Sequence, residues 1–161
     1  MKIGVVADTH SMDLPPQMLE AFRQVDLIIH AGDFCCLSVL DTLGKIREVK
    51  AVYGNMDDPD VRQRLPEKQI IECGSVKIGL YHGAGAAANI LDTVQQAFVN
   101  DTVDAVVFGH SHQALNRRIG GVLYFNPGSA TDTVRAPYRS YGIMDVNHSG
   151  VKAKIIKVDK S

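Results

Sequence analysis

Short apolar segments alternate with helical patterns through the first part of the chain. The segments IGVVA, DLIIHA and VKAVY are rich in β-branched residues and predict strands. Between them, the spacing of apolar residues predicts helices over 16–24 and 37–46, and the first of these begins at a proline that suits a first helical turn. Strands that alternate with helices in this way are typical of βαβ units in a parallel sheet.

The pattern becomes richer in strands farther along the chain. After a short helix over 59–64, the segments KQIIE and VKIGLYH flank a turn at 73–75 and predict an antiparallel hairpin. A helix over 87–99 leads to the strand VDAVVFGH, which is followed by GVLYFN, SYGIMDV and VKAKIIKV. We therefore expect an α/β fold of two packed mixed β-sheets flanked by helices, a four-layer α/β/β/α sandwich.

Composition limits the classes of protein that fit. With 161 residues, 45% of them hydrophobic, the chain is long enough for one buried core, so we expect a single domain over 1–161. The net charge of -1 shows no basic excess that would indicate a nucleic-acid partner. The apolar runs are far shorter than the roughly 20 residues that cross a bilayer, and no signal peptide is recognised. We expect a cytoplasmic location, and the sequence leaves a homo-oligomer open.

Polar side chains follow the predicted strands in five short motifs. Aspartate, histidine and asparagine provide ligands that suit manganese, iron, zinc, nickel or cobalt. Side chains placed where successive strands of an open α/β sheet end converge on one crevice. We therefore expect one metal site instead of unrelated turn and core residues. Its candidate ligands are Asp8, His10, Asp33, Asn55, His82, His110 and His112.

The glycines and cysteines near these motifs are interpreted as structural. Gly32, Gly54, Gly83 and Gly109 adjoin candidate ligands, and glycine permits the tight turns and close backbone approach that a crowded site needs. Three cysteines, two of them adjacent, imply no disulfide framework and suit a reducing compartment. Although Cys35 and Cys36 lie close to Gly32 and Asp33, we interpret them as small buried hydrophobic residues. The sixth histidine, at 148, is expected in an exposed turn.

The motifs DxH, GD, GN, H and GHxH, in this order, resemble those of the calcineurin-like metallophosphoesterase superfamily. Three further segments are similar to its small single-domain prokaryotic phosphodiesterase branch: IHAGD at 29–33, NPGS at 126–129 and SYGIMD at 140–145. The resemblance covers nearly the whole chain. It implies a single metallophosphoesterase domain whose partner is a small phosphate-ester substrate.

The resemblance also implies two divalent metal ions, of which manganese is our first expectation. One ion would be held by Asp8, His10, Asp33 and His112. The other would be held by Asp33, Asn55, His82 and His110, so that Asp33 is shared. In such a site a bridging hydroxide attacks phosphorus, and the ions stabilise the attacking and leaving oxygens. The implied function is a dinuclear metal-dependent phosphodiesterase, with Asp33, Asn55 and His110 as its catalytic residues.

Three positions need a separate interpretation. Many superfamily members carry a histidine directly after the asparagine of the GN motif, where this chain has Met56. A thioether cannot donate a proton, so we expect stronger activity on esters with good leaving groups. At His30 the resemblance implies a side chain that orients ligands by hydrogen bonds, and a histidine satisfied at a strand end fits equally well. For Asp57 we expect contact with the metal ligands instead of metal coordination, or a plain helix-start or turn carboxylate.

Two other functions remain open from the sequence. A phosphomonoesterase or nucleotidase would use the same metal ligands, which do not distinguish a diester from a monoester. A non-catalytic binding scaffold is the second, as in the retromer subunit that resembles this fold and has degraded ligand motifs. The intact His10, His82 and GHSH segment weigh against it. Residues that could contact substrate, none of them predicted to be catalytic, are Arg117, Arg118, Arg135, Arg139 and Asn126.

Overall fold

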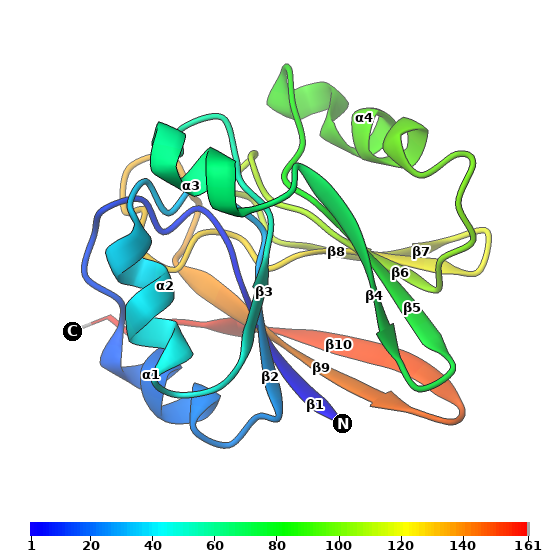
Figure 1. Cartoon of the computed structure of the whole chain (residues 1–161), viewed down its shortest axis with the longest axis horizontal. Helices are drawn as coiled ribbons and strands as arrows, with labels where there is room; N and C mark the ends of the chain where they lie inside the picture. Colours follow the sequence, from blue (N-terminus) through cyan, green and yellow to red (C-terminus); the bar gives the residue numbers. More distant parts are fainter. Residues whose placement is uncertain (161) are drawn as a thin grey trace.

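The computed structural model describes residues 1–160 and contains two five-stranded mixed sheets with helices outside them (Figure 1). The first sheet is formed by β1 (Lys2–Val6), β2 (Leu27–His30), β3 (Val49–Ala51), β9 (Ser140–Asn147) and β10 (Gly150–Lys157). The second sheet is formed by β4 (Lys68–Cys73), β5 (Val76–Tyr81), β6 (Ala105–Val107), β7 (Leu115–Ile119) and β8 (Val122–Asn126). The expected fold class is confirmed.

Each sheet contains three parallel strands, and antiparallel strands extend it. The first sheet has the order β10-β9-β1-β2-β3, in which β1, β2 and β3 are parallel, whereas β9 runs antiparallel to both β1 and β10. The second sheet has the order β4-β5-β6-β8-β7, in which β5, β6 and β8 are parallel. The predicted hairpin is the antiparallel pair β4 and β5. The carboxyl ends of parallel strands in each sheet are thus available to form a site.

The largest part of the core lies between the two sheets. Successive side chains of a strand point to opposite faces, so alternate residues of each strand enter this layer. Ile3 and Val5 of β1 belong to the same buried cluster as Ile78 and Leu80 of β5 and Phe125 of β8. All five are fully buried. The apolar positions that identified the strands in the sequence are therefore the ones that join the two sheets.

The helices cover the outer faces of the sheets. They are α1 (Pro16–Phe22), α2 (Leu37–Gly44), α3 (Pro59–Arg64) and α4 (Ile90–Ala97), with a 3-10 turn η1 (Ala87–Asn89) before α4. Figure 1 shows α1 and α2 beside the first sheet and α4 beside the second. Phe22 of α1 packs so closely on the first sheet that a Cβ on Gly4 would lie 2.7 Å from its ring. None of the helices within residues 1–160 is long and apolar enough to cross a membrane.

Most expected elements are present, with differences at their ends. The helices expected to end at 24 and 46 end at Phe22 and Gly44, and the helix expected over 87–99 begins as the 3-10 turn η1. Strand β7 was not predicted. Its sequence LNRRI has three exposed residues between two partly buried ones, so it lacks the apolar alternation of a strand. It forms by pairing with β8 at the edge of the second sheet.

Candidate metal centre

The seven candidate ligands lie at the carboxyl ends of five strands, drawn from both sheets. Asp8 and His10 follow β1, Asp33 follows β2, and Asn55 follows β3; these are parallel strands of the first sheet. In the second sheet His82 follows β5, and the histidines of the GHSH motif follow β6. Because the two sheets pack face to face, their strand ends meet at one edge of the molecule. The convergence expected from the motif order is present.

The backbone at these positions is unusual. Positive φ angles are uncommon for residues other than glycine, and they persist where the surrounding structure holds them, often at functional sites. Within residues 1–160, six non-glycine residues have positive φ, between 50° and 73°, and five of them are candidate ligands. The six are Asp8, His10, Asp33, Cys35, His110 and His112. Strained backbone conformations at five candidate ligands therefore direct their side chains toward one point.

The carboxylate of Asp8 lies at the centre of the group and is fully buried. Its Oδ2 accepts a hydrogen bond from the backbone N–H of His110 at 2.9 Å. Its Oδ1 lies 3.6 Å from Nε2 of His112 and 3.7 Å from Nε2 of His82. Within residues 1–160, Oδ1 of Asp8 is the only buried side-chain nitrogen or oxygen without a hydrogen-bond partner. Burial raises the pKa of Asp8 to about 7.

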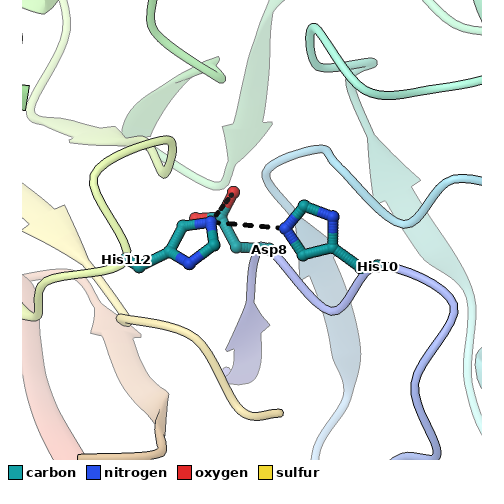
Figure 2. Close-up of side chains that lie close together, drawn as sticks. All are labelled: Asp8, His10 and His112. Carbon is teal, nitrogen blue, oxygen red and sulfur yellow. Dashed lines mark hydrogen bonds and ion pairs between the residues drawn. The ribbon is translucent and has the colours of Figure 1, made fainter. Parts of the chain in front are cut away.

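The first candidate metal group consists of Asp8, His10 and His112, whose ligand atoms lie within 4.8 Å of one another. Figure 2 shows the two imidazoles on either side of the carboxylate, with their Nε2 atoms turned toward each other. These two nitrogens are 3.3 Å apart. Burial lowers the pKa of His10, which favours the neutral imidazole that binds metals.

The second candidate group consists of Asp8, Asp33 and His82, and it is buried throughout. Oδ2 of Asp33 lies 3.2 Å from Nε2 of His82. Although burial acts in the opposite direction, hydrogen bonding between them holds the pKa of Asp33 low and that of His82 high. The amide oxygen of Asn55 lies 3.1 Å from Nε2 of His82 and 3.2 Å from Nδ1 of His110. The structure therefore brings all seven expected ligands into one network.

The donor set fits divalent cations. Carboxylate, imidazole and amide oxygen atoms without thiolate suit borderline to hard ions. Asp8 belongs to both candidate groups, and its Oδ1 accepts no hydrogen bond although two imidazole nitrogens lie within 3.7 Å of it. A buried carboxylate oxygen normally has a hydrogen-bond partner, because an isolated buried charge is costly. The expected sharing of Asp33 between two ions stays a prediction.

Hydrogen bonds at the far side of the imidazole rings set the direction of the ligand atoms. Nδ1 of His82 donates to the carbonyl oxygen of Ala31 at 2.8 Å. Nδ1 of His112 lies 2.6 Å from Oδ2 of Asp132. A ring that donates from Nδ1 presents its Nε2 lone pair, and such partners commonly orient metal-binding histidines. Both Nε2 atoms consequently face Oδ1 of Asp8.

The sequence did not identify Asp132 as part of the site. Its carboxylate accepts the His112 hydrogen bond, and the backbone N–H groups of Val134 and Arg135 donate to its Oδ1 at 2.8 and 3.0 Å. Although burial acts the other way, these hydrogen bonds hold the pKa of Asp132 far below its usual range. In the sequence, Asp132 is marked only by its position shortly after NPGS, and this position does not indicate that it contacts His112.

His30 and Asp57 support the site without joining the ligand network. His30 is fully buried, accepts the backbone N–H of Gly32 at Nδ1, and shares a hydrogen bond with Thr9 at Nε2. Burial lowers its pKa to about 3, so it is neutral. Asp57 accepts four backbone N–H groups, those of Asp33, Phe34, Cys35 and Gly54, at 2.6 to 3.0 Å. It therefore fastens the loop after β2 to the loop after β3.

The NPGS segment fastens the remaining ligand loops. Nδ2 of Asn126 donates to the carbonyl oxygen of Gly109, and Oγ of Ser129 donates to the carbonyl oxygen of Asp8. Thr131 donates in the same way to the carbonyl oxygen of Thr9. Asn126 is thus a buried structural residue and does not contact the cavity.

Glycine is required where ligand loops touch. A Cβ on Gly54 would lie 2.2 Å from Oδ1 of Asp33, and one on Gly32 would lie 2.8 Å from Nδ1 of His82. Gly32 also has a φ of 101°. The close approach expected from the sequence is confirmed at both positions.

The interpretation of Cys35 and Cys36 as small buried hydrophobic residues was wrong, whereas Cys73 is buried. Cys35 and Cys36 are half-buried. Sγ of Cys35 lies 3.7 Å from Nδ1 of His10, so this thiol lies beside a candidate ligand and not in the core. The backbone N–H of Cys35 donates to the buried carboxylate of Asp57 at 2.6 Å, which fixes the course of the loop at this residue. The expected exposed turn at His148 is confirmed.

A cavity of about 450 Å³ opens beside the candidate ligands. It has the size of a small-molecule site. Of the four arginines considered from the sequence, only Arg135 lines it. Arg118 instead donates to the carbonyl oxygen of Val151, and Arg139 donates to that of Asp159. The lining residues are His10, Met12, Asp33, Asn55, Met56, His110, His112, Thr131, Asp132, Thr133, Val134 and Arg135.

Comparison with known families identifies the class of this protein. A family model described as the calcineurin-like phosphoesterase superfamily domain matches residues 1–149. The chain belongs to this superfamily, so it is a metallophosphoesterase by family, and the resemblance drawn from the five motifs is confirmed.

Individual relatives are small prokaryotic metallophosphoesterases and proteins of the same fold. A probable metallophosphoesterase of Methanocaldococcus jannaschii is 35% identical over 99% of this chain and 83% of the relative. A phosphodiesterase of the same organism is 29% identical over 80% of this chain and 83% of the relative. The structure of wild-type Vps29 complexed with zinc, from Entamoeba histolytica, is 26% identical with a TM-score of 0.74, covering 98% of this chain and 99% of that one.

Proposed function

We propose that this protein is a dinuclear metal-dependent phosphodiesterase that hydrolyses small phosphate esters, with manganese as the expected metal and 1–161 as one catalytic domain. The observation that carries the proposal is Oδ1 of Asp8. This buried carboxylate oxygen has no hydrogen bond and lies within 3.7 Å of two imidazole nitrogens. When bound, two divalent ions would supply Lewis acidity and a hydroxide nucleophile at neutral pH.

The residues of this chain would position the reacting groups. Nε2 of His82 is directed into the centre by the hydrogen bond to Ala31, and Nε2 of His112 by the one to Asp132. Asn55 and His110 line the cavity and would lie beside a bound phosphate. A guanidinium at Arg135 can clamp a non-bridging phosphate oxygen with two parallel hydrogen bonds. This arrangement neutralises and orients a phosphate group.

Met56 supports a preference for esters with good leaving groups. Its side chain lines the cavity and cannot donate a proton to a leaving oxygen. General acid catalysis typically contributes about 10² to 10⁴ in rate, so esters that need it should react slowly. We expect a steep fall in rate as the leaving-group pKa rises along a series of aryl esters. A rate independent of leaving-group pKa would contradict this expectation.

The direct test is hydrolysis of bis(p-nitrophenyl) phosphate by the full chain after metal removal and addition of manganese. We expect turnover that depends on the added metal and falls to background in Asp33→Ala, because this change removes an expected ligand of both ions. Asp60→Ala, at an exposed carboxylate of α3, is the matched control and should retain full turnover. Failure to hydrolyse the diester with any of manganese, nickel, iron, zinc or cobalt would overturn the proposal.

A phosphomonoesterase or nucleotidase remains the nearest alternative, because the same ligand network would serve it. The open cavity with a single arginine favours the diester, which carries one negative charge, over the dianionic monoester. Turnover of p-nitrophenyl phosphate and its diester under the same conditions separates the two. A higher kcat/KM for the monoester would reassign the activity.

The similarity to Vps29 supports one candidate of another class, a scaffold of the same fold. The complete ligand network weighs against a role without metal. A chain that binds no divalent ion in calorimetry and forms a stable complex with another protein would favour the scaffold.

A further inference from the structure

Three exposed apolar side chains lie around the mouth of the metal cavity, and we call them the apolar rim: Met12, Met56 and Val134. Their exposed fractions are 60%, 56% and 88%. Six large hydrophobic residues are exposed within residues 1–160, and half of them therefore line this one cavity. Scattered exposed hydrophobic residues need no explanation, whereas a cluster at a cavity marks a binding surface.

The apolar rim is assembled from three loops that are distant in the sequence. Met12 lies after β1, Met56 after β3, and Val134 between β8 and β9. Two of these positions are tied to the metal centre. The backbone N–H of Met56 donates to Oδ1 of Asp33 at 2.8 Å, and that of Val134 donates to Asp132, which also binds His112. The rim is thus held in place by the same carboxylates that organise the centre.

The cavity also has one cationic side chain, that of Arg135, beside the apolar rim. Arg135 follows Val134 directly and is the only lysine or arginine among the lining residues. Its guanidinium forms no ion pair within the described residues, and its backbone N–H is fixed by Asp132. The cavity therefore offers candidate metal ligands and one exposed arginine for a phosphate, and an apolar border for the group that the phosphate carries. A volume of about 450 Å³ holds a small molecule rather than a helix of a partner protein.

We infer that the substrates are phosphodiesters with at least one aromatic or similarly bulky apolar ester group, which packs against Met12, Met56 and Val134. This inference rests on the proposed function, since it names the substrate class of the same site. The phosphate lies between the metal centre and Arg135, and the apolar group covers the three exposed side chains. A diester with two small groups, such as dimethyl phosphate, occupies the metal centre and leaves the rim in water.

Binding of two stable diester analogues by the manganese-loaded full chain tests the inference without turnover. Methyl phenylphosphonate and methyl methylphosphonate carry the same single charge and differ only in the apolar group. Calorimetry should show the phenyl compound binding about tenfold or more tightly, as expected for burying part of a ring. In Val134→Thr and Met56→Gln this ratio should fall several-fold. The isosteric change Val99→Thr, at an exposed valine outside the cavity, should leave the ratio unchanged.

Equal affinity for the two analogues overturns the inference, as does a ratio that survives in both rim variants or the absence of binding by either compound. A phenyl preference that is lost in Val99→Thr as well also overturns it, because the contact would then not be at the rim. The proposed function is judged separately. If the wild-type chain does not hydrolyse diesters but still prefers the phenyl analogue, the proposed catalytic function is rejected and the proposed binding site is retained.

Discussion

Asp8 is fully buried, and its Oδ1 accepts no hydrogen bond. We therefore predict that this candidate ligand lowers the free energy of unfolding of the protein when no metal is bound. The pKa of Asp8 is raised from its ordinary value of 3.8 to about 7 because the group is fully buried. At about 1.36 kcal/mol per pKa unit, this difference corresponds to at most about 4 kcal/mol of destabilisation when the group is ionised. Asp8→Asn removes the charge, keeps the size of the side chain, and leaves an oxygen to accept the hydrogen bond from His110.

The sign of the pH dependence follows from proton binding. Since the folded protein holds this proton more tightly than the unfolded chain, the contribution of Asp8 to stability is greatest below pH 3.8 and falls as the pH rises toward about 7. Wild type and Asp8→Asn should therefore be nearly equal in stability near pH 4. In EDTA at pH 8 the variant should be more stable by about 2 to 4 kcal/mol, or about 4 to 16 °C in melting temperature for a chain of this size.

Thermal unfolding followed by circular dichroism, between pH 4 and 8 with EDTA, measures the difference. Adding manganese should stabilise the wild type strongly and Asp8→Asn little, so that the order of stability reverses. A variant that is less stable than the wild type in EDTA at pH 8 would refute this reasoning. A difference that does not change with pH would refute it as well.

Two further substitutions test the residues that support the ligands. Asp57→Ala leaves four backbone N–H groups without an acceptor and should lower the free energy of unfolding in urea by at least about 3 kcal/mol. The control Asp60→Ala should change it by less than about 0.5 kcal/mol. A loss below about 1 kcal/mol in Asp57→Ala would argue against the role given to Asp57. Asp132→Asn weakens the partner that orients His112 and should reduce manganese affinity about 10- to 100-fold in calorimetry. Asp145→Asn, at an exposed carboxylate, is its control, and equal affinities in the two variants would argue against orientation by Asp132.

The fold and the ligands could be predicted because each leaves a local signal. The continuous apolar run IGVVA is buried on both faces of the first sheet, and the alternating segment VKIGLY contributes to the core between the sheets. The candidate ligands follow these strands where the strands end. The five motifs identified all seven candidate ligands, which the structure brings together. Strand β7 has no such signal, since its polar sequence is held only by pairing with β8.

The supporting contacts could not be predicted because they join residues that are far apart in the chain. Asp132 meets His112 across 20 residues, and Ser129 meets the backbone of Asp8 across 121. The contact of Cys35 with His10 depends on the course of the loop after β2. Nothing in the local pattern distinguishes these residues from ordinary turn residues, so only the packing of the loops reveals them.

The most direct test of the central claim is anomalous diffraction from crystals of this protein loaded with manganese. We expect two ions per chain, roughly 3.5 to 4 Å apart, among the seven candidate ligands, with Asp8 bound to at least one of them. A single ion, or ions bound away from Asp8, would contradict the dinuclear centre proposed for this fold.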